Sequence, residues 1–514
     1  MAKQETFYIT TTLPYVNADP HIGFAAEIVR ADIIARYQRM LGNEVFFNTG
    51  TDEHGLKIYR QAKEARQDVQ KYVDQYAAKF QLLDDALDLS FNSFIRTTNP
   101  EHVKAAQEFW TICQKNGDIY KKNYQVKYCV GCELEKSDSE LENGCCPIHP
   151  KLKIEFIDEE NYFFAWSKYQ KKLIELYENN SDFVVPQHRL TEIKNFVSSG
   201  LQDFSISRLK SKMPWGVPVP GDEEHVMYVW FDALINYISC LGWPKDKKKF
   251  KKFWPGVQVA GKDNLRQQTA MWQAMLMSAG LPNSKQVLIF GFINSGGQKM
   301  SKSLGNVINP MEVVHKYGTD ATRYFIAAGL SAFEDSDFTY ERFEEKYNSD
   351  LANDLGNLFS RTLSMTDKYF QCRVPKFNVD YDKFFEFDLK TDWERYDHYF
   401  KTYQFDKAVE VVWENIRKCN AYIDKEKPWE LANVDRDKLA DVMYNLLETL
   451  RQSAIFLRPF LPQTSEKLLT GLGYDPAKEF SKPLKDLKKW ASLPLDQKIN
   501  KGQPLFPRLE TESK

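Results

Sequence analysis

The N-terminal part of the chain alternates short apolar runs with segments of helical periodicity. Phe7 to Thr12 form a strand-like run of aromatic and β-branched residues. Apolar positions then recur at the spacing of one buried helix face, at Ala26, Val29, Ile33, Tyr37 and Leu41. A second strand that runs into a helix is predicted between Met227 and Tyr237. This alternation is typical of an α/β domain.

The pattern changes after about residue 345, where strand-like runs cease. Periodic segments predict helices near 346–369, 383–401, 403–426 and 436–457, with another after Pro462. Long periodic segments separated by short breaks are typical of a helix bundle. The pattern alone indicates packing and no particular activity.

A turn joins the first predicted strand to the first predicted helix. It spans Pro14 to Phe24 and places His21 at the helix N-terminus, with Gly23 just behind it. Free backbone N–H groups and the positive end of the helix dipole favour an anion at such a position. Glycine leaves the backbone open to close approach by a ligand. A histidine near a helix start is more often structural than functional, so its role depends on what accompanies it.

Two lysines and two hydroxyls lie together roughly 280 residues downstream. Lys299 to Ser303 follow the glycine pair within Ser295 to Gln298. A flexible basic loop of this kind can close over phosphate oxygens and stabilise negative charge during phosphoryl or adenylyl transfer. A solvated surface loop accounts for the same residues equally well.

Length and composition are those of an ordinary globular protein with two or three domains. The chain has 514 residues, of which 43% are hydrophobic and 27% charged, and its formal net charge is −2. The N-terminus lacks the apolar core of a signal peptide, and no run reaches the length of a membrane span. Eight cysteines without a secretory signal favour metal-bound or buried thiols in a reducing compartment. We therefore expect a cytoplasmic protein.

Four residues have the spacing of a structural zinc site. Cys129 and Cys132 form a C-x2-C pair, and Cys146 and His149 form a C-x2-H pair after thirteen intervening residues. Each pair can present two ligands to one side of a tetrahedral ion, and three thiolates with one imidazole leave no open position for catalysis. Cys145 is an alternative ligand, although Cys146 reproduces the spacing of the first pair.

The two loops together resemble the signatures of class I aminoacyl-tRNA synthetases. These are His21-Ile22-Gly23 after the first strand and Lys299-Met300-Ser301-Lys302-Ser303 downstream. Further segments resemble the methionyl-tRNA synthetase family, namely Leu13–Asn17, Gly50–Gly55, Val229–Ala233 and Gly261–Asn264. The zinc pattern and the order of the motifs resemble the same family, from about residue 6 to about residue 470.

The resemblance implies a methionine–tRNA ligase. Such an enzyme activates L-methionine with ATP to methionyl-adenylate and pyrophosphate, then transfers the methionyl group to the terminal adenosine of tRNA(Met). It implies one structural Zn²⁺, Mg²⁺ with ATP, and no membrane contact. A monomer is expected, because the chain ends soon after the helical half and leaves no room for an appended dimer-forming domain.

The resemblance also implies a domain order. A Rossmann-type parallel sheet forms the catalytic domain, a zinc-knuckle insertion divides it, and an α-helical bundle binds the anticodon. The expected boundaries are 1–115 and 227–298 for the catalytic halves, 116–226 for the insertion, 299–345 for the Lys299–Ser303 loop with a stem-contact region, and 346–514 for the bundle.

Roles for single residues follow from the same resemblance. Catalytic roles fall to His21, Lys299, Lys302 and Arg208. ATP is expected at His21, Gly23, Phe24, Glu27, Gly261, Asp263, Lys299 and Lys302. The methionine pocket is expected to comprise Leu13, Tyr15, Asp52, Trp230, Ala233, Tyr237 and Gln268, with Asp52 on the α-ammonium. The anticodon is expected at Asn357, Arg361 and Trp429, and the metal at Cys129, Cys132, Cys146 and His149.

The chain departs from the family pattern at four positions. Phe24 stands where a histidine or asparagine is common, and Phe290 where a histidine is common. Gln267 and Gln268 replace an aromatic–histidine pair beside the methionine pocket. We favour a subfamily variant, because His21 and both loop lysines are retained. The alternatives are a class I synthetase for another amino acid and a catalytically weak paralogue that binds tRNA without charging it.

Overall fold

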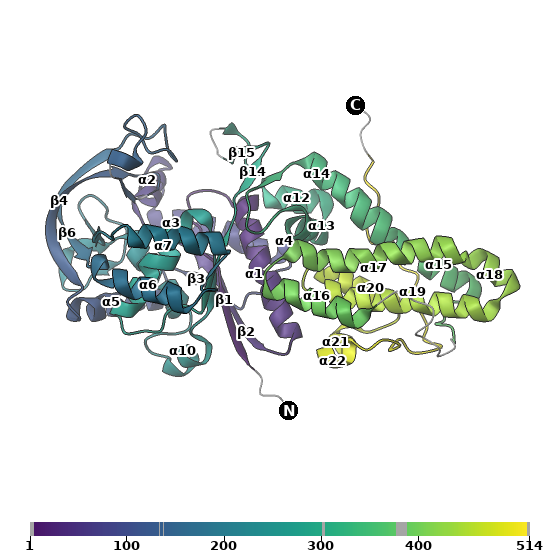
Figure 1. The fold of residues 1–514 in the computed structure, drawn as a ribbon. Coiled ribbons are helices and arrows are strands. Elements are labelled where there is room, and N and C mark those ends of the chain that lie inside the picture. Colours follow the sequence, from purple (N-terminus) through teal and green to yellow (C-terminus); the bar gives the residue numbers. More distant parts are fainter. Residues whose placement is uncertain (1–4, 133, 137, 301–303, 377–387, 511–514) are drawn as a thin grey trace.

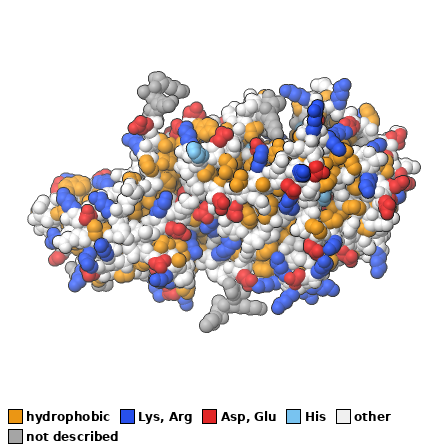
Figure 2. Space-filling view, turned by 180° about the vertical axis from the view of Figure 1, so that it is seen from behind, with side chains coloured by type: hydrophobic (Ala, Val, Ile, Leu, Met, Phe, Trp, Pro, Cys, Tyr) orange, Lys and Arg blue, Asp and Glu red, His pale blue; other side chains and the backbone are white. Residues whose placement is uncertain are grey.

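The molecule is elongated, with a mixed α/β part that carries the N-terminus beside an all-helical part (Figure 1). The computed structural model describes residues 5–132, 134–136, 138–300, 304–376 and 388–510. Acidic and basic side chains are interspersed over most of the face in Figure 2, in keeping with the small net charge. No helix among the described residues is long and apolar enough to cross a membrane.

A six-stranded parallel sheet organises the α/β part, which confirms the predicted fold class. Its strands are β1 (Thr6–Thr10), β2 (Glu44–Thr51), β3 (Ser93–Arg96), β7 (Val184–Val185), β12 (Val257–Gly261) and β13 (Gln286–Phe290). They lie in the order β3-β2-β1-β12-β13-β7, all parallel. The strand order reverses between β1 and β12. In open α/β sheets, ligands bind beyond the carboxyl ends of the strands at such a reversal.

Helix α1 (Ile22–Met40) follows the turn after β1, as the apolar spacing predicts. It contacts β1, β2 and β12, and it also contacts segments that belong to the C-terminal half of the chain. Most of its residues are buried, because it packs against partners on more than one side. Figure 1 shows it at the junction of the two parts.

The segment that follows β3 and α5 (Pro100–Lys115) folds around a long antiparallel pair, β4 (Ile119–Cys129) and β6 (Glu155–Phe164). The short strands β5 (Leu134–Lys136) and β8 (Phe204–Ser205) complete this sheet, and helices α6 (Gln170–Asn179) and α7 (Gln187–Ser198) follow β6. A second small sheet joins β9 (Ser207–Leu209), β10 (Pro218–Val219) and β11 (Asp222–Met227). Strand β7, between α6 and α7, pairs with β13 and so attaches this segment to the edge of the main sheet.

A hairpin leads into the basic loop. Its strands are β14 (Ile293–Ser295) and β15 (Gln298–Lys299), and β16 (Ser336–Phe338) pairs with β14. Gly296 and Gly297 form the turn with φ of +61° and +72°. Only glycine adopts such angles without strain, and two in succession give the tight hairpin turn that matches strand twist.

The helical part contains the predicted long helices. They are α15 (Asn357–Phe370), α16 (Leu389–Lys401), α17 (Phe405–Glu426), α19 (Arg436–Leu457) and α20 (Pro462–Gly471). Helix α14 (Tyr340–Lys346) and a π-helix at Tyr347–Gly356 precede α15, and the short α18 (Pro428–Val434) caps the far end. The predicted start of the second helix, at 383–387, lies outside the described residues.

A buried ion pair joins the two parts. Asp32 of α1 accepts from Arg323 of α13 (Thr319–Tyr324) at 2.8 Å, and both side chains are fully buried. The same guanidinium donates to the carbonyls of Leu87, Pro459 and Phe460, the last two of which precede α20. Burial alone would raise the pKa of Asp32, but Arg323 and Arg36 hold it below its ordinary value.

Replacing Arg323 by methionine should destabilise the fold by about 3 kcal/mol, because the buried Asp32 charge would keep Arg36 and the Ser90 donors but lose its fully buried cation. Denaturant unfolding at pH 7 measures this loss. The matched control is Arg373→Met, which removes an exposed ion pair with Asp496 and should cost no more than about 0.5 kcal/mol. The pKa of Asp32 is lower in the folded state than in the unfolded state. The ionised carboxylate therefore stabilises the fold fully above the unfolded-state pKa, and this stabilisation is lost as the pH falls through the folded-state pKa. Equal losses for both variants at pH 7 would contradict the assigned role of the pair.

Candidate active site and metal cluster

The turn after β1 places His21 at the start of α1. His21 caps the helix, and its Nδ1 accepts from the Gly23 N–H at 3.1 Å. A Cβ at position 23 would lie 2.9 Å from the His21 ring, so a larger residue would displace the capping imidazole. Enclosure of the ring and the nearby Lys299 ammonium lower the pKa of His21. The imidazole is therefore neutral near pH 7, and Nε2 is left as a donor toward the cavity.

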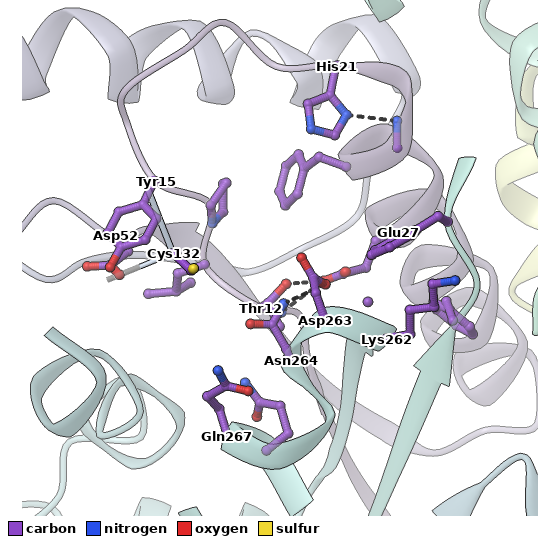
Figure 3. Close-up of a pocket in the computed structure, with 18 of the residues that line it drawn as sticks. Thr12, Tyr15, His21, Glu27, Asp52, Cys132, Lys262, Asp263, Asn264 and Gln267 are labelled. Atoms are coloured by element: carbon purple, nitrogen blue, oxygen red, sulfur yellow. Dashed lines mark hydrogen bonds between the residues drawn. The ribbon is translucent and has the colours of Figure 1, made fainter. Parts of the chain in front are cut away.

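A cavity of about 760 Å³ opens at the carboxyl ends of β1 and β12, at the reversal of strand order. Figure 3 shows the side chains that converge on it from both strand ends and from α1. The predicted residues that line it are Leu13, Tyr15, His21, Gly23, Phe24, Glu27, Asp52, Trp230, Ala233, Tyr237, Gly261, Asp263, Gln268 and Lys299. The structure thus brings together side chains separated by more than 200 positions in the chain.

Two carboxylates face each other at the centre of the cavity. Glu27 accepts from the backbone N–H of Thr12 at 3.0 Å and from its hydroxyl at 2.5 Å, and Asp263 lies next to it (Figure 3). Burial raises the pKa of Glu27 to about 7, and the Asp263 charge adds to the rise. Burial also raises the pKa of Asp263, against the opposing effect of Lys299. Such acceptors suit hydroxyl donors of a sugar ring.

An aromatic and amide wall closes the other end. Tyr15 and Asp52 form a single parallel bridge at the end of β1, and Asp52 is buried. Gln268 donates to the Tyr237 hydroxyl at 2.7 Å. Gln267 precedes it in a π-helix, Gln267–Met271, a local widening that is frequent at functional sites. The side-chain amide oxygen of Gln267 and the indole nitrogen of Trp230 are buried with no partner among the described residues.

The two phenylalanine departures from the family pattern have packing partners. Phe24 meets Phe80 edge to face at a centroid distance of 5.4 Å. Phe290 lies beneath the guanidinium of Arg30, 5.2 Å from its ring centroid. Both phenylalanines and both of their partners line the cavity. A phenylalanine at either position therefore makes the cavity wall more apolar than a histidine would.

Several predicted residues are not brought to the cavity. Arg208 is buried between the rings of Tyr128 and Tyr228 and donates to Ser205 Oγ and the Ser207 carbonyl. Asn357, Arg361 and Trp429 belong to α15 and α18 of the helical part. There Arg361 pairs with Asp424 at 2.9 Å, and 44% of Trp429 is exposed. Lys302 lies outside the described residues.

The cysteine pattern closes into a group that could hold a metal ion. Ligand atoms of Cys129, Cys132, Cys146 and His149 all lie within 4.8 Å of one another. Cys145 is not in this group. A Cβ at Gly131 would lie 2.4 Å from the His149 ring, so the first pair needs glycine between its cysteines. Cys132 and His149 also line the large cavity, which makes the cluster part of its wall.

Sequence reasoning missed several charged residues of the cavity wall. They are Arg30, Lys57, Arg189, Glu192 and Lys262. Arg30 carried a usable signal, because it lies three positions after Glu27 and therefore on the same face of α1. Arg189 and Glu192 come from α7, whose approach to the cavity depends on tertiary packing.

Comparison with known proteins matches both parts of the chain. The family described as tRNA synthetases class I (M) matches residues 7–153 and 137–363, and the anticodon binding domain of methionyl tRNA ligase matches residues 378–514. The methionine–tRNA ligase of Thermotoga maritima is 40% identical over 98% of this chain and 81% of its own length. That of Synechocystis sp. is 40% identical over 98% of both chains.

A solved structure agrees with the sequence comparison. Mycobacterium tuberculosis methionyl-tRNA synthetase in complex with methionyl-adenylate superimposes with a TM-score of 0.93 at 34% identity, over 98% of this chain and 100% of that one. Identity at this level over nearly the whole length, together with the cavity at the strand reversal, establishes the relationship. The chain belongs to the methionyl-tRNA synthetase family of class I aminoacyl-tRNA synthetases.

Proposed function

We propose that the chain ligates L-methionine to tRNA(Met) in two steps within the cavity at the β1–β12 reversal. The methionine carboxylate attacks the α-phosphorus of ATP and pyrophosphate leaves. The 2′-hydroxyl of the terminal tRNA adenosine then attacks the adenylate carbonyl, and AMP leaves. The observation that carries the proposal is one cavity lined by His21 and Lys299 at one end and by the methionine-pocket residues at the other.

The first step needs positioning and charge stabilisation, and no protein nucleophile. His21 and Lys299 stabilise the charge that develops on the leaving pyrophosphate, and Lys302 is proposed to join them. Asp263 accepts from the ribose hydroxyls, and Glu27 fixes the end of β1 beside it through Thr12. Gly23 and Gly261 give the nucleotide close access to the backbone. Mg²⁺ would accompany ATP and would neutralise part of the charge on its phosphates.

Methionine is held at its α-ammonium group and at its thioether side chain. Asp52 is buried at the cavity wall and takes the α-ammonium. The thioether lies among the aromatic residues Tyr15, Trp230 and Tyr237, because sulfur makes favourable contacts with ring edges. Leu13, Ala233 and Gln268 complete the pocket, and the Gln268 bond fixes the direction of the Tyr237 hydroxyl.

The cysteine cluster is proposed to bind one structural Zn²⁺. Three thiolates and one imidazole at mutual ligand distances match a closed tetrahedral site. The residues fit the ion because the donor atoms already converge. When bound, zinc would fix the loop that forms part of the cavity wall and would take no part in the chemical steps.

The helical part is proposed to read the anticodon in a monomeric enzyme. Trp429 is a large apolar side chain left exposed at the tip of the bundle, and exposed aromatic planes stack unpaired bases. Asn357 and Arg361 lie i, i+4 on α15 and offer amide and guanidinium groups to base edges. We further propose the boundaries 1–115, 116–226, 227–298, 299–345 and 346–514 for the functional units.

A weakly catalytic paralogue that binds tRNA is the second candidate, favoured by Phe24, Phe290 and Gln267. ATP–pyrophosphate exchange over a panel of amino acids separates the two. Exchange with methionine alone supports the ligase, exchange with another amino acid redirects the specificity, and no exchange at all supports the paralogue.

Lys299→Met should lower the rate of methionine-dependent pyrophosphate exchange by about 10²-fold, because a donor to developing negative charge is lost. The matched control is Lys285→Met, at an exposed lysine near Phe7 at the start of β13, which should change the rate less than about twofold. A wild-type rate in Lys299→Met would refute the assignment of this lysine.

Cys146→Ser should abolish zinc binding, whereas Cys145→Ser should keep about one zinc per chain, because only Cys146 belongs to the ligand group. Elemental analysis of the purified variants measures the zinc content. Pyrophosphate exchange should fall in Cys146→Ser alone, since the cluster forms part of the cavity wall. Loss of zinc from Cys145→Ser with retention in Cys146→Ser would reverse the ligand assignment.

Trp429→Ala should reduce the charging of tRNA(Met) by at least about tenfold and leave pyrophosphate exchange unchanged, because stacking on a base is worth about 1–3 kcal/mol. Val434→Ala, an exposed apolar position on the same helix, serves as the control and should alter neither rate. Parallel losses of both rates in Trp429→Ala would indicate misfolding and not a tRNA contact.

A further inference from the structure

Three arginines of this chain are among its fully buried large side chains, and one of them differs from the other two. Arg323 binds Asp32, and Arg451 binds Glu448 at 2.7 and 2.8 Å. Arg30 forms no ion pair with any residue that the structure describes. One of its terminal nitrogens donates to the carbonyls of Leu330 and Ser331, at 3.3 and 2.7 Å, and its Nε is buried without a partner.

An unpaired guanidinium is costly to bury, so its position requires an explanation. Burial lowers the pKa of Arg30 to about 10, against the favourable effect of the Glu27 and Asp406 charges. Arg30 also lines the large cavity, unlike Arg323 and Arg451. A guanidinium is a donor at every nitrogen and accepts nothing. A ligand acceptor in the cavity would therefore satisfy the group that the protein leaves open.

The place of Arg30 along α1 limits which part of a ligand it can meet. It lies nine residues after His21, or about 13 Å along the helix axis from the end that faces phosphate. The carboxylate of Glu27 lies between them on the same helix and disfavours a phosphate so deep in the cavity. The guanidinium also lies over the ring of Phe290, another residue of the cavity wall. A flat, neutral group with ring acceptors fits these neighbours.

We infer that Arg30 binds the adenine base of ATP, with its side chain donating to a ring nitrogen that carries a lone pair. The candidates are N1, N3 and N7 of adenine. The ring of Phe290 packs against the guanidinium, and the carbonyls of Leu330 and Ser331 accept hydrogen bonds from one of its terminal nitrogens. The inference rests on the proposed function, because it takes the nucleotide of that reaction as the ligand.

The test compares ATP with 1-deaza-, 3-deaza- and 7-deaza-ATP in pyrophosphate exchange, for the wild type and for Arg30→Met. In the wild type, the analogue that lacks the contacted nitrogen should show a kcat/KM at least about tenfold below that of ATP. In Arg30→Met, ATP should fall by a similar factor, and the penalty for that one analogue should vanish. Unchanged penalties for all three analogues in the variant would overturn the inference.

A purely structural arginine gives a different result, because its loss would lower the rates with all four nucleotides by one common factor. Arg30→Lys is the second variant, should Arg30→Met fail to fold. Its ammonium keeps the charge but cannot place a donor where Nε lies, so the same single penalty should again vanish. If the wild type shows no exchange with methionine, the proposed function fails. Equilibrium binding of the four nucleotides to wild type and variant then decides the contact separately.

Discussion

The burial of α1 between the sheet and the helical part is the constraint on which the rest of the structure depends. Its first residue follows the His21 cap, its first turns carry Glu27 and Arg30 into the cavity wall, and Asp32 then binds Arg323 from the other part. Tyr37 continues the contact, with its ring stacked on Phe400 at 3.8 Å. Because one helix carries all these contacts, a shift of the helical part would displace the His21 end of the cavity as well.

Acidic and basic side chains lie in different parts of the cavity. The acids Glu27 and Asp263 meet at its centre, where burial raises the pKa of both, while Lys299 lies toward the His21 end. No single small ion can satisfy this arrangement, because acceptors and donors are needed at different depths. A nucleotide supplies phosphate oxygens, sugar hydroxyls and ring nitrogens in that order along its length. The cavity is therefore electrostatically complementary to an extended ligand with these groups in sequence.

Features fixed by short-range geometry could be predicted from the sequence. The cap at His21, the glycine at position 23 and the C-x2-C and C-x2-H pairs each depend on a few neighbouring residues, and their local arrangement follows from spacing. Features set by distant packing could not. One terminal nitrogen of Arg208 donates to both Ser205 and Ser207, a contact that a motif does not reveal. The apolar spacing of α1 predicted the helix, but the distant carbonyls of Leu330 and Ser331 and the ring of Phe290 determine where the Arg30 side chain is held.

The cysteine cluster shows how a chemically closed site can still matter for catalysis. Three thiolates and an imidazole leave a bound metal no open position, so the ion cannot act on a substrate. Yet Cys132 and His149 are themselves part of the cavity wall, and Gly131 leaves no space between them for a side chain. The four donor atoms already lie within 4.8 Å of one another, so a bound ion would hold them in the arrangement that the fold gives them. A bound metal ion would therefore fix the shape of this part of the wall.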